Sequence, residues 1–308
     1  MSSRNFRVGA SFPTSEIGVD PIVIRDFAQA VEDMGYARLC AYDHVIGANL
    51  ASRPDWTGPY NHMTPFHEPL VLFGYLAGLT SRIELFTAVI ILPQRQTALV
   101  AKQAANVDIY SGGRLSVGVG IGWNAVEYEA LDAPFSRRGA RLDDQIRFLR
   151  RLWTEPAFTE AGEFHRITDA GINPMPTRGA LPIWIGGWSN AAMMRAVRLG
   201  QGWMPSLPRD AAAETVAAYD AALSAAGRDP ASAGLDNMVL LGATIGGPIR
   251  NAEAAVADAM AWRDAGASGV NVDTMKMGLK SVDEHIALFR RVAEDLGLGK
   301  ATPGKTAG

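Results

Sequence analysis

The chain has 308 residues, of which 48% are hydrophobic and 20% are charged, and its formal net charge is −3 at pH 7. This composition is typical of a globular protein with a large core, and no basic stripe indicates a nucleic-acid partner. Cys40 is the single cysteine, so an internal disulfide bond is excluded, which favours a cytoplasmic location. We interpret Cys40 as a core residue. The longest aliphatic run, residues 88–92, is too short to cross a bilayer, so we expect no membrane association.

Short apolar runs alternate with helical patterns along the chain, and eight of these runs are predicted strands. They are Phe6–Ala10, Ala37–Ala41, Ile83–Val89, Leu115–Val119, Ile183–Gly186, Gly202–Pro205, Met238–Ile245 and Gly269–Asp273. Eight successive strand–helix units favour a parallel sheet closed into a (β/α)8 TIM barrel. An open doubly wound sheet is the alternative, which the absence of a G-x-G-x-x-G motif after the first strand disfavours.

Two connections are much longer than the rest, residues 43–66 after the second strand and residues 122–182 after the fourth. Both begin at the carboxyl end of a strand, where TIM barrels place their active sites. Residues 1–298 are expected to form one domain with these two insertions, and the polar residues 299–308 a disordered tail.

Asp43 and His44 follow the second strand directly. A histidine at this end of a barrel titrates near neutral pH and suits acid/base catalysis, whereas the alternative is a loop histidine that Asp43 holds for structure. The aromatic loop that follows contains Trp56 and Tyr60, which we expect to line the substrate pocket. His67 is a further pocket candidate, with a core or capping role as its alternative.

The other histidines indicate no metal site. His165 and His285 are expected at the surface, and no histidine or cysteine spacing resembles a set of metal ligands. There is also no G-x-S-x-G elbow of a serine hydrolase.

Glycines mark the exits of two predicted strands. Gly120 and Gly122 would let a flat or anionic ligand approach the backbone. Gly186 and Gly187 precede a helix whose free N–H groups and dipole favour a phosphate, although a plain capped turn is the alternative. The small residues 87–89 could leave room for a planar ring, or could simply be core.

Five segments together resemble the bacterial luciferase-like monooxygenase superfamily, and more closely its coenzyme F420-dependent oxidoreductases. The segments are Ala41–His44, Thr87–Val89 with Pro93 and Arg95, Ser111–Asn124, Arg138–Asp143 and Pro182–Gly187. The resemblance extends from Arg7 to Leu298. It implies a (β/α)8 barrel, a homodimer, and a flavin or deazaflavin that lies across the carboxyl-terminal mouth.

The same resemblance implies roles for individual residues. Asp43 and His44 would lie near the reactive ring, and a non-proline cis peptide would join Ala88 and Val89. The cofactor-binding residues would be Thr87, Ala88, Val89, Gly120, Gly122, Trp123, Asn124, Gly186, Gly187, Trp188 and Ser189. Trp123 stands where the sugar-phosphate dehydrogenases of this family have a glutamate, which implies a more apolar substrate here.

The expected function is that of an F420-dependent oxidoreductase. It would transfer a hydride between the deazaflavin C5 and a small organic substrate, with His44, oriented by Asp43, as the acid/base group. The first alternative is an FMN-dependent monooxygenase. The second is a non-catalytic flavin-binding barrel that stores or senses the cofactor.

Overall fold

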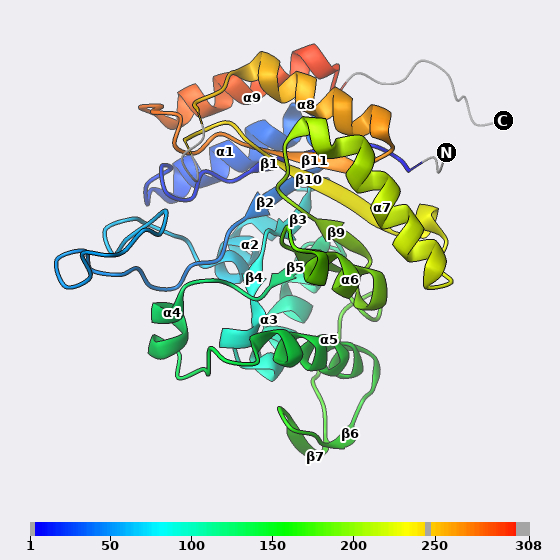
Figure 1. Ribbon diagram of the computed structural model, residues 1–308. Coiled ribbons are helices and arrows are strands. Elements are labelled where there is room, and N and C mark those ends of the chain that lie inside the picture. Colours follow the sequence, from blue (N-terminus) through cyan, green and yellow to red (C-terminus); the bar gives the residue numbers. More distant parts are fainter. Residues whose placement is uncertain (1–3, 244–247, 300–308) are drawn as a thin grey trace.

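A computed structural model describes residues 4–243 and 248–299 of the chain. Parallel strands close into a barrel in the order β1, β2, β3, β5, β8, β9, β10 and β11, and the short β4 continues the β3 position alongside β5 (Figure 1). The TIM-barrel prediction is therefore confirmed. The barrel strands are β1 (Arg7–Ser11), β2 (Arg38–Ala41), β3 (Glu84–Thr87), β4 (Ile90–Ile91), β5 (Leu115–Gly120), β8 (Ile183–Gly186), β9 (Gly202–Met204), β10 (Gly234–Leu240) and β11 (Gly269–Asp273).

Helices surround the barrel and turn an apolar stripe toward it. In α1, Asp20 caps the first turn by accepting a hydrogen bond from the Ile22 amide at 2.8 Å, and Phe27 and Val31 are buried. None of the helices in the described part of the chain combines the length and the apolar character needed to cross a bilayer. The helices are α1 (Pro21–Asp33), α2 (Pro69–Ala77), α3 (Thr97–Tyr110), α4 (Ala125–Ala130), α5 (Arg138–Thr154), α6 (Asn190–Leu199), α7 (Ala212–Ala225), α8 (Ala252–Ala265) and α9 (Val282–Leu296), with short 3-10 turns η1 (Leu92–Gln94), η2 (Arg209–Ala211) and η3 (Pro230–Ser232).

The barrel interior is layered. At the amino-terminal end, the buried Arg38 guanidinium pairs with Asp236 and, at 3.0 Å, with Glu84. Above it, Cys40 packs in a cluster with Phe86, Ala88, Trp184, Met204 and Met238, and Tyr42, Val89 and Leu240 lie against this cluster. Cys40 is fully buried, which confirms its interpretation as a core residue, and this burial raises the pKa of its thiol.

Two parts of the sheet prediction are corrected. β10 spans Gly234–Leu240 rather than Met238–Ile245, and residues 244 and 245 of the predicted strand lie outside the described residues. The fourth connection also contains an antiparallel hairpin of β6 (Phe158–Ala161) and β7 (Arg166–Ala170), which was not predicted. Of the predicted tail, residues 300–308 lie outside the described part as well.

The two long connections position the site. The segment from residue 43 to residue 66 contains no helix or strand, and it projects on the same side of the barrel as α4, at the left of Figure 1. The segment from residue 122 to residue 182 contributes α4, α5 and the hairpin. Both leave the carboxyl-terminal end of a parallel strand, so they meet above the barrel mouth.

Candidate active site at the barrel mouth

His44 is paired with a buried carboxylate. Its Nδ1 lies 3.3 Å from Oε1 of Glu127, which also accepts a 2.8 Å hydrogen bond from the Val45 amide. Glu127 is 1% exposed, whereas the His44 side chain is 15% exposed. A buried carboxylate therefore orients an imidazole whose other side reaches the mouth.

Sequence reasoning missed Glu127. It stands in the first turn of α4, which Asn124 caps by accepting a hydrogen bond from the Val126 amide at 3.0 Å. The pattern Asn-x-x-Glu, formed by Asn124 and Glu127, is visible in the sequence. It indicates the start of a helix, however, and not a catalytic role for the glutamate. Trp123 stands where the sugar-phosphate dehydrogenases have a glutamate, but the site still contains a carboxylic acid, because Glu127 follows four residues later.

Asp43 has different partners from those expected. Its carboxylate accepts hydrogen bonds from Nε and Nη2 of Arg95 at 3.0 and 2.5 Å, and from the Ile91 amide at 2.9 Å. Successive residues of an extended chain point to opposite sides, so Asp43 faces β4 and Arg95, which follows η1, while His44 faces the mouth. The interpretation that Asp43 orients His44 is wrong, since Glu127 occupies that place.

Aromatic side chains enclose His44. The Tyr60 ring lies 3.9 Å from the imidazole, and its hydroxyl accepts a 2.6 Å hydrogen bond from Nδ2 of Asn124. The Trp56 indole donates to the Tyr60 carbonyl at 2.8 Å, and its ring lies 5.6 Å from that of Trp123. Burial and the nearby Glu127 raise the pKa of Tyr60, so its phenol is neutral.

A cavity of about 270 Å³ opens beside this group of residues. Its lining residues are His44, Val45, Ile46, Gly47, Tyr60, His62, Thr64 and Phe66. The structure thus brings four of the predicted site residues, Trp56, Tyr60, Trp123 and Asn124, around His44. It adds His62, which was not among the predicted pocket residues.

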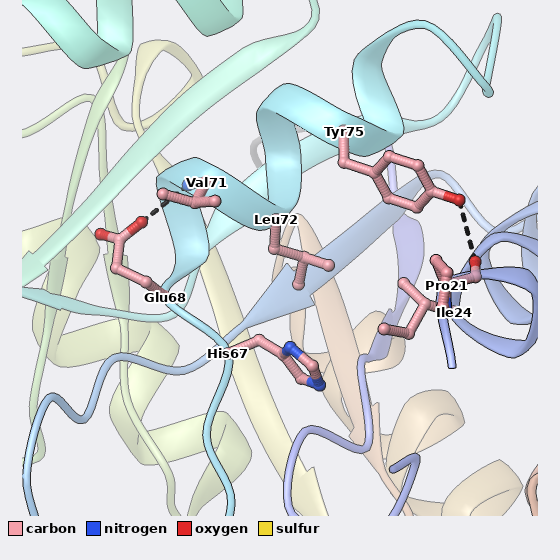
Figure 2. A pocket seen from close by; sticks show the side chains of 7 residues that line it. All are labelled: Pro21, Ile24, His67, Glu68, Val71, Leu72 and Tyr75. Carbon is pink, nitrogen blue, oxygen red and sulfur yellow. Dashed lines mark hydrogen bonds between the residues drawn. The ribbon is translucent and has the colours of Figure 1, made fainter. Parts of the chain in front are cut away.

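His67 lies elsewhere. It lines a separate, mainly apolar pocket of about 190 Å³ between the first turns of α1 and α2, together with Ile24, Leu72 and Tyr75 (Figure 2). Its Nε2 lies 2.9 Å from the Gly18 carbonyl oxygen. The structure therefore does not bring His67 to the cavity beside His44.

The interrupted third strand forms the floor of the mouth. The predicted cis peptide between Ala88 and Val89 is present. A Cβ on Gly120 would lie 2.6 Å from Cγ2 of Val89, and one on Gly186 would lie 2.5 Å from Cγ1. These glycines make room for the Val89 side chain, which is a packing reason that the sequence could not reveal. Thr87 is buried in the wall and donates to the Gly118 carbonyl at 2.8 Å.

The turn that leads into α6 contains backbone amides without a hydrogen-bond acceptor among the described residues, but the Gly187 amide is not one of them. Gly187 has a φ of 122°, and its amide donates to the Met204 carbonyl at 3.2 Å. Ser189 caps the helix by accepting from the Ala192 amide at 3.2 Å. The amides of Asn190 and Ala191 make no hydrogen bond to another described residue, and the neighbouring Trp188 is 65% exposed. An anion at this helix end would therefore meet residues 188–191.

Comparison with known proteins places the chain in a family. It matches the luciferase-like monooxygenase family over residues 7–299. An uncharacterized protein of Mycobacterium tuberculosis is 36% identical over 182 residues, which are 58% of this chain and 62% of that protein, so the match spans less than two thirds of the relative. The FMNH(2)-dependent dimethylsulfone monooxygenase of Pseudomonas putida is 34% identical over 137 residues, 43% of this chain and 38% of that enzyme.

The fold itself recurs in solved structures. The structure of an F420-dependent secondary alcohol dehydrogenase in complex with an F420-acetone adduct superposes with a TM-score of 0.75 at 15% identity, and covers 95% of this chain and 99% of that one. The family match over nearly the whole length, together with the barrel and its interrupted third strand, leads to one conclusion. The chain belongs to the luciferase-like monooxygenase family.

Proposed function

We propose that this protein is an F420-dependent oxidoreductase, which transfers a hydride between C5 of the deazaflavin and a small, apolar organic substrate. The observation that supports this most is the His44–Glu127 pair, which stands at the mouth beside a cavity whose lining includes Tyr60 and Phe66. The closer resemblance of the five segments named above to the F420-dependent branch favours the deazaflavin.

The residues at the mouth fit such a cofactor. Val89 would provide an apolar floor for a flat ring, and Gly120 and Gly186 leave the room that its side chain occupies. The free amides of Asn190 and Ala191 would hold a phosphate at the positive end of the α6 dipole. When bound there, the deazaflavin supplies a carbon that gives or takes a hydride.

The side chains around the ring would handle the proton and exclude water. For an alcohol substrate, His44 would take the hydroxyl proton as the substrate gives a hydride from the adjacent carbon to the deazaflavin; for a carbonyl substrate, it would return that proton. The buried Glu127 stabilises the imidazolium that forms. Trp56, Tyr60 and Trp123 form an aromatic group beside His44, which would limit the access of water to the reacting atoms once a substrate is bound.

An FMN-dependent monooxygenase is the alternative. It is favoured by the Pseudomonas putida relative, whose name states FMNH(2) dependence and whose match includes 43% of this chain. A non-catalytic flavin-binding barrel is a weaker alternative, because the His44–Glu127 pair is arranged for proton transfer and storage of a cofactor would not need it.

Calorimetric titration of the purified protein with F420 and with FMN tests the proposal. We expect F420 to bind more tightly than FMN. If FMN binds more tightly, or copurifies and supports oxygen-dependent turnover, the monooxygenase replaces this proposal. If a bound cofactor supports no turnover with alcohols, ketones or oxygen, the non-catalytic barrel does.

A further inference from the structure

The cavity beside His44 contains a second histidine, His62, to which the proposed function gives no task. Both side chains line the same space of about 270 Å³. His62 lies near the end of the loop from residue 43 to residue 66, and His44 lies near its start. A space of this size suits a small molecule rather than a drug-sized ligand. A substrate whose reacting group lies at His44 can therefore extend toward His62.

The backbone of the loop fixes the position and the tautomer of His62. The Ala48 carbonyl accepts a hydrogen bond from the His62 amide at 3.0 Å and lies 3.3 Å from its Nδ1. A Cβ on Gly47 would lie 2.3 Å from the Asn61 carbonyl oxygen, so the two limbs of the loop touch backbone to backbone here. Because a carbonyl oxygen only accepts, Nδ1 carries the proton, and Nε2 of the neutral ring offers a lone pair. Within the described part of the chain, Nε2 makes no hydrogen bond.

Thr64, which also lines the cavity, offers a donor. Its Oγ1 accepts a hydrogen bond from the Asn61 amide at 3.2 Å, and its amide donates to the Asn61 carbonyl at 3.0 Å. Neither contact uses the hydroxyl hydrogen, which is donated to no other residue that the structure describes. His62 and Thr64 thus present one acceptor and one donor. A ligand hydroxyl group, which donates one hydrogen bond and accepts another, matches this combination.

The charge of the lining favours a neutral ligand. None of the lining residues, all of which belong to the described part of the chain, is Asp, Glu, Lys or Arg. Glu127 is buried behind His44, with 3.3 Å between its Oε1 and the imidazole Nδ1. A ligand carboxylate in the cavity would meet no lysine or arginine of the lining, and the Glu127 carboxylate would repel it. An uncharged hydroxyl carries no such cost.

We propose that His62 and Thr64 bind a second hydroxyl group of the substrate, which is a neutral alcohol or ketone with one hydroxyl besides its reacting oxygen. Nε2 of His62 accepts the proton of this hydroxyl, and Thr64 donates to its oxygen, while the reacting oxygen lies at His44. The inference rests on the proposed function and adds one polar group to its otherwise apolar substrate. His62 and Thr64 determine specificity, and His44 remains the catalytic residue.

Matched alcohols test this assignment. Butane-2,3-diol is compared with 2-butanol, and pentane-2,4-diol with 2-pentanol, so the second hydroxyl is added at two spacings. With F420 as hydride acceptor, we expect kcat/KM per reacting hydroxyl to be about tenfold higher for at least one diol than for its matched alcohol. His62→Phe and Thr64→Val should each lower this ratio to about threefold or less. His67→Phe is the control and should keep the ratio, because His67 lines a separate pocket.

Binding without turnover gives a second arm. Dissociation constants of the same alcohols are measured by ligand-observed NMR on the protein without added cofactor. We expect the same preference of about tenfold for a diol and the same loss in His62→Phe. Both members of a probe pair are measured on the same variant, so general damage to the fold cancels in the ratio. The probe 3-hydroxybutanoate, which has a carboxylate in place of the second hydroxyl, should bind no more tightly than 2-butanol.

The outcomes separate this inference from the proposed function. The inference is overturned if neither diol is preferred, if either His62→Phe or Thr64→Val keeps the full ratio, or if 3-hydroxybutanoate binds more tightly than the diols. Turnover of 2-butanol or 2-pentanol with F420 would still support the proposed function in each of these cases. If no alcohol is turned over while the NMR ratio is tenfold and depends on His62, the hydroxyl site stands and hydride transfer from alcohols is overturned.

Discussion

The β2 side and the β8 side of the barrel mouth are built from different chemistry. On the β2 side, side chains face the mouth: His44 with Glu127, and Tyr42 with Asp273. On the β8 side, Gly186 leaves room for Val89, and the free groups are backbone amides at the start of α6. The difference supports the proposed function, in which the β2 side would meet the substrate and carry the reaction while the β8 side would hold a phosphate.

The largest expected effect is on turnover. His44→Asn should lower kcat by about 10²- to 10⁴-fold, because it removes the proton-transfer group, and it should change cofactor affinity much less. Steady-state kinetics and calorimetry measure the two quantities. His67→Asn is the matched control, since His67 lies in a separate pocket, and it should keep kcat. Weakened cofactor binding with normal kcat in His44→Asn would mean that His44 only positions the ring.

Asp43→Asn should act on stability. The Asp43 carboxylate is buried against Arg95, so its removal leaves a guanidinium whose remaining ion-pair partner among the described residues is Glu68, at 2.9 Å. We expect a loss of about 3 kcal/mol in the free energy of unfolding, measured by urea denaturation. Asp33→Asn, which breaks an exposed pair with Arg82, should cost less than about 0.5 kcal/mol. If kcat falls strongly while the stability of the variant is unchanged, Asp43 takes part in the reaction and its role is not structural.

The free energy of unfolding should depend on pH in a way that reflects the protonation of Asp273. Its pKa is raised to about 6 in the folded protein, above the ordinary value of about 3.9, so the folded state binds the proton more tightly. This contribution to stability is present below about pH 4 and is lost as the pH rises through 6, by about 2–3 kcal/mol in total. Asp273→Asn removes it. The variant should therefore gain that amount relative to the natural protein between pH 4 and pH 7 in urea denaturation, and a constant difference would contradict the assignment.

The smallest effect is expected at the β8 side. Ser189→Asp keeps a good helix cap but places a negative charge where the phosphate would bind. FMN affinity should fall about fivefold while riboflavin affinity stays the same. Ser281→Asp makes the same exchange at the cap of α9 and should change neither affinity. Equal losses for FMN and riboflavin in Ser189→Asp would argue against a phosphate at α6.

The sequence predicted the barrel well because its signals are local. Alternating apolar strands and capped helices give the element order, and the predicted bounds of β8 and β11 match the structure. The start of β10 was misplaced because its inward-facing Asp236 pairs with Arg38 inside the barrel, which breaks the apolar pattern. The hairpin of β6 and β7 was missed because its strands are mostly exposed and have no apolar run.

The site was predicted in part, since its partners come from distant segments. His44 was found from its position at a strand end, Tyr60 from the aromatic composition of the loop, and Trp123 from the family resemblance. Glu127 was missed because nothing in the order of residues shows which carboxylate reaches a histidine 83 positions earlier. The prediction of a surface position for His285 was wrong for the same reason, because it is buried between Thr274 and Glu16.

The division of work between the two sides is tested most directly by one paired measurement, the cofactor Kd and the kcat at saturating cofactor for His44→Asn and Ser189→Asp. The account predicts that His44→Asn keeps the Kd and loses kcat, whereas Ser189→Asp raises the Kd and keeps kcat. If His44→Asn raises the Kd as much as it lowers kcat, or if Ser189→Asp lowers kcat at saturation, the two sides do not have separate tasks and the account is wrong.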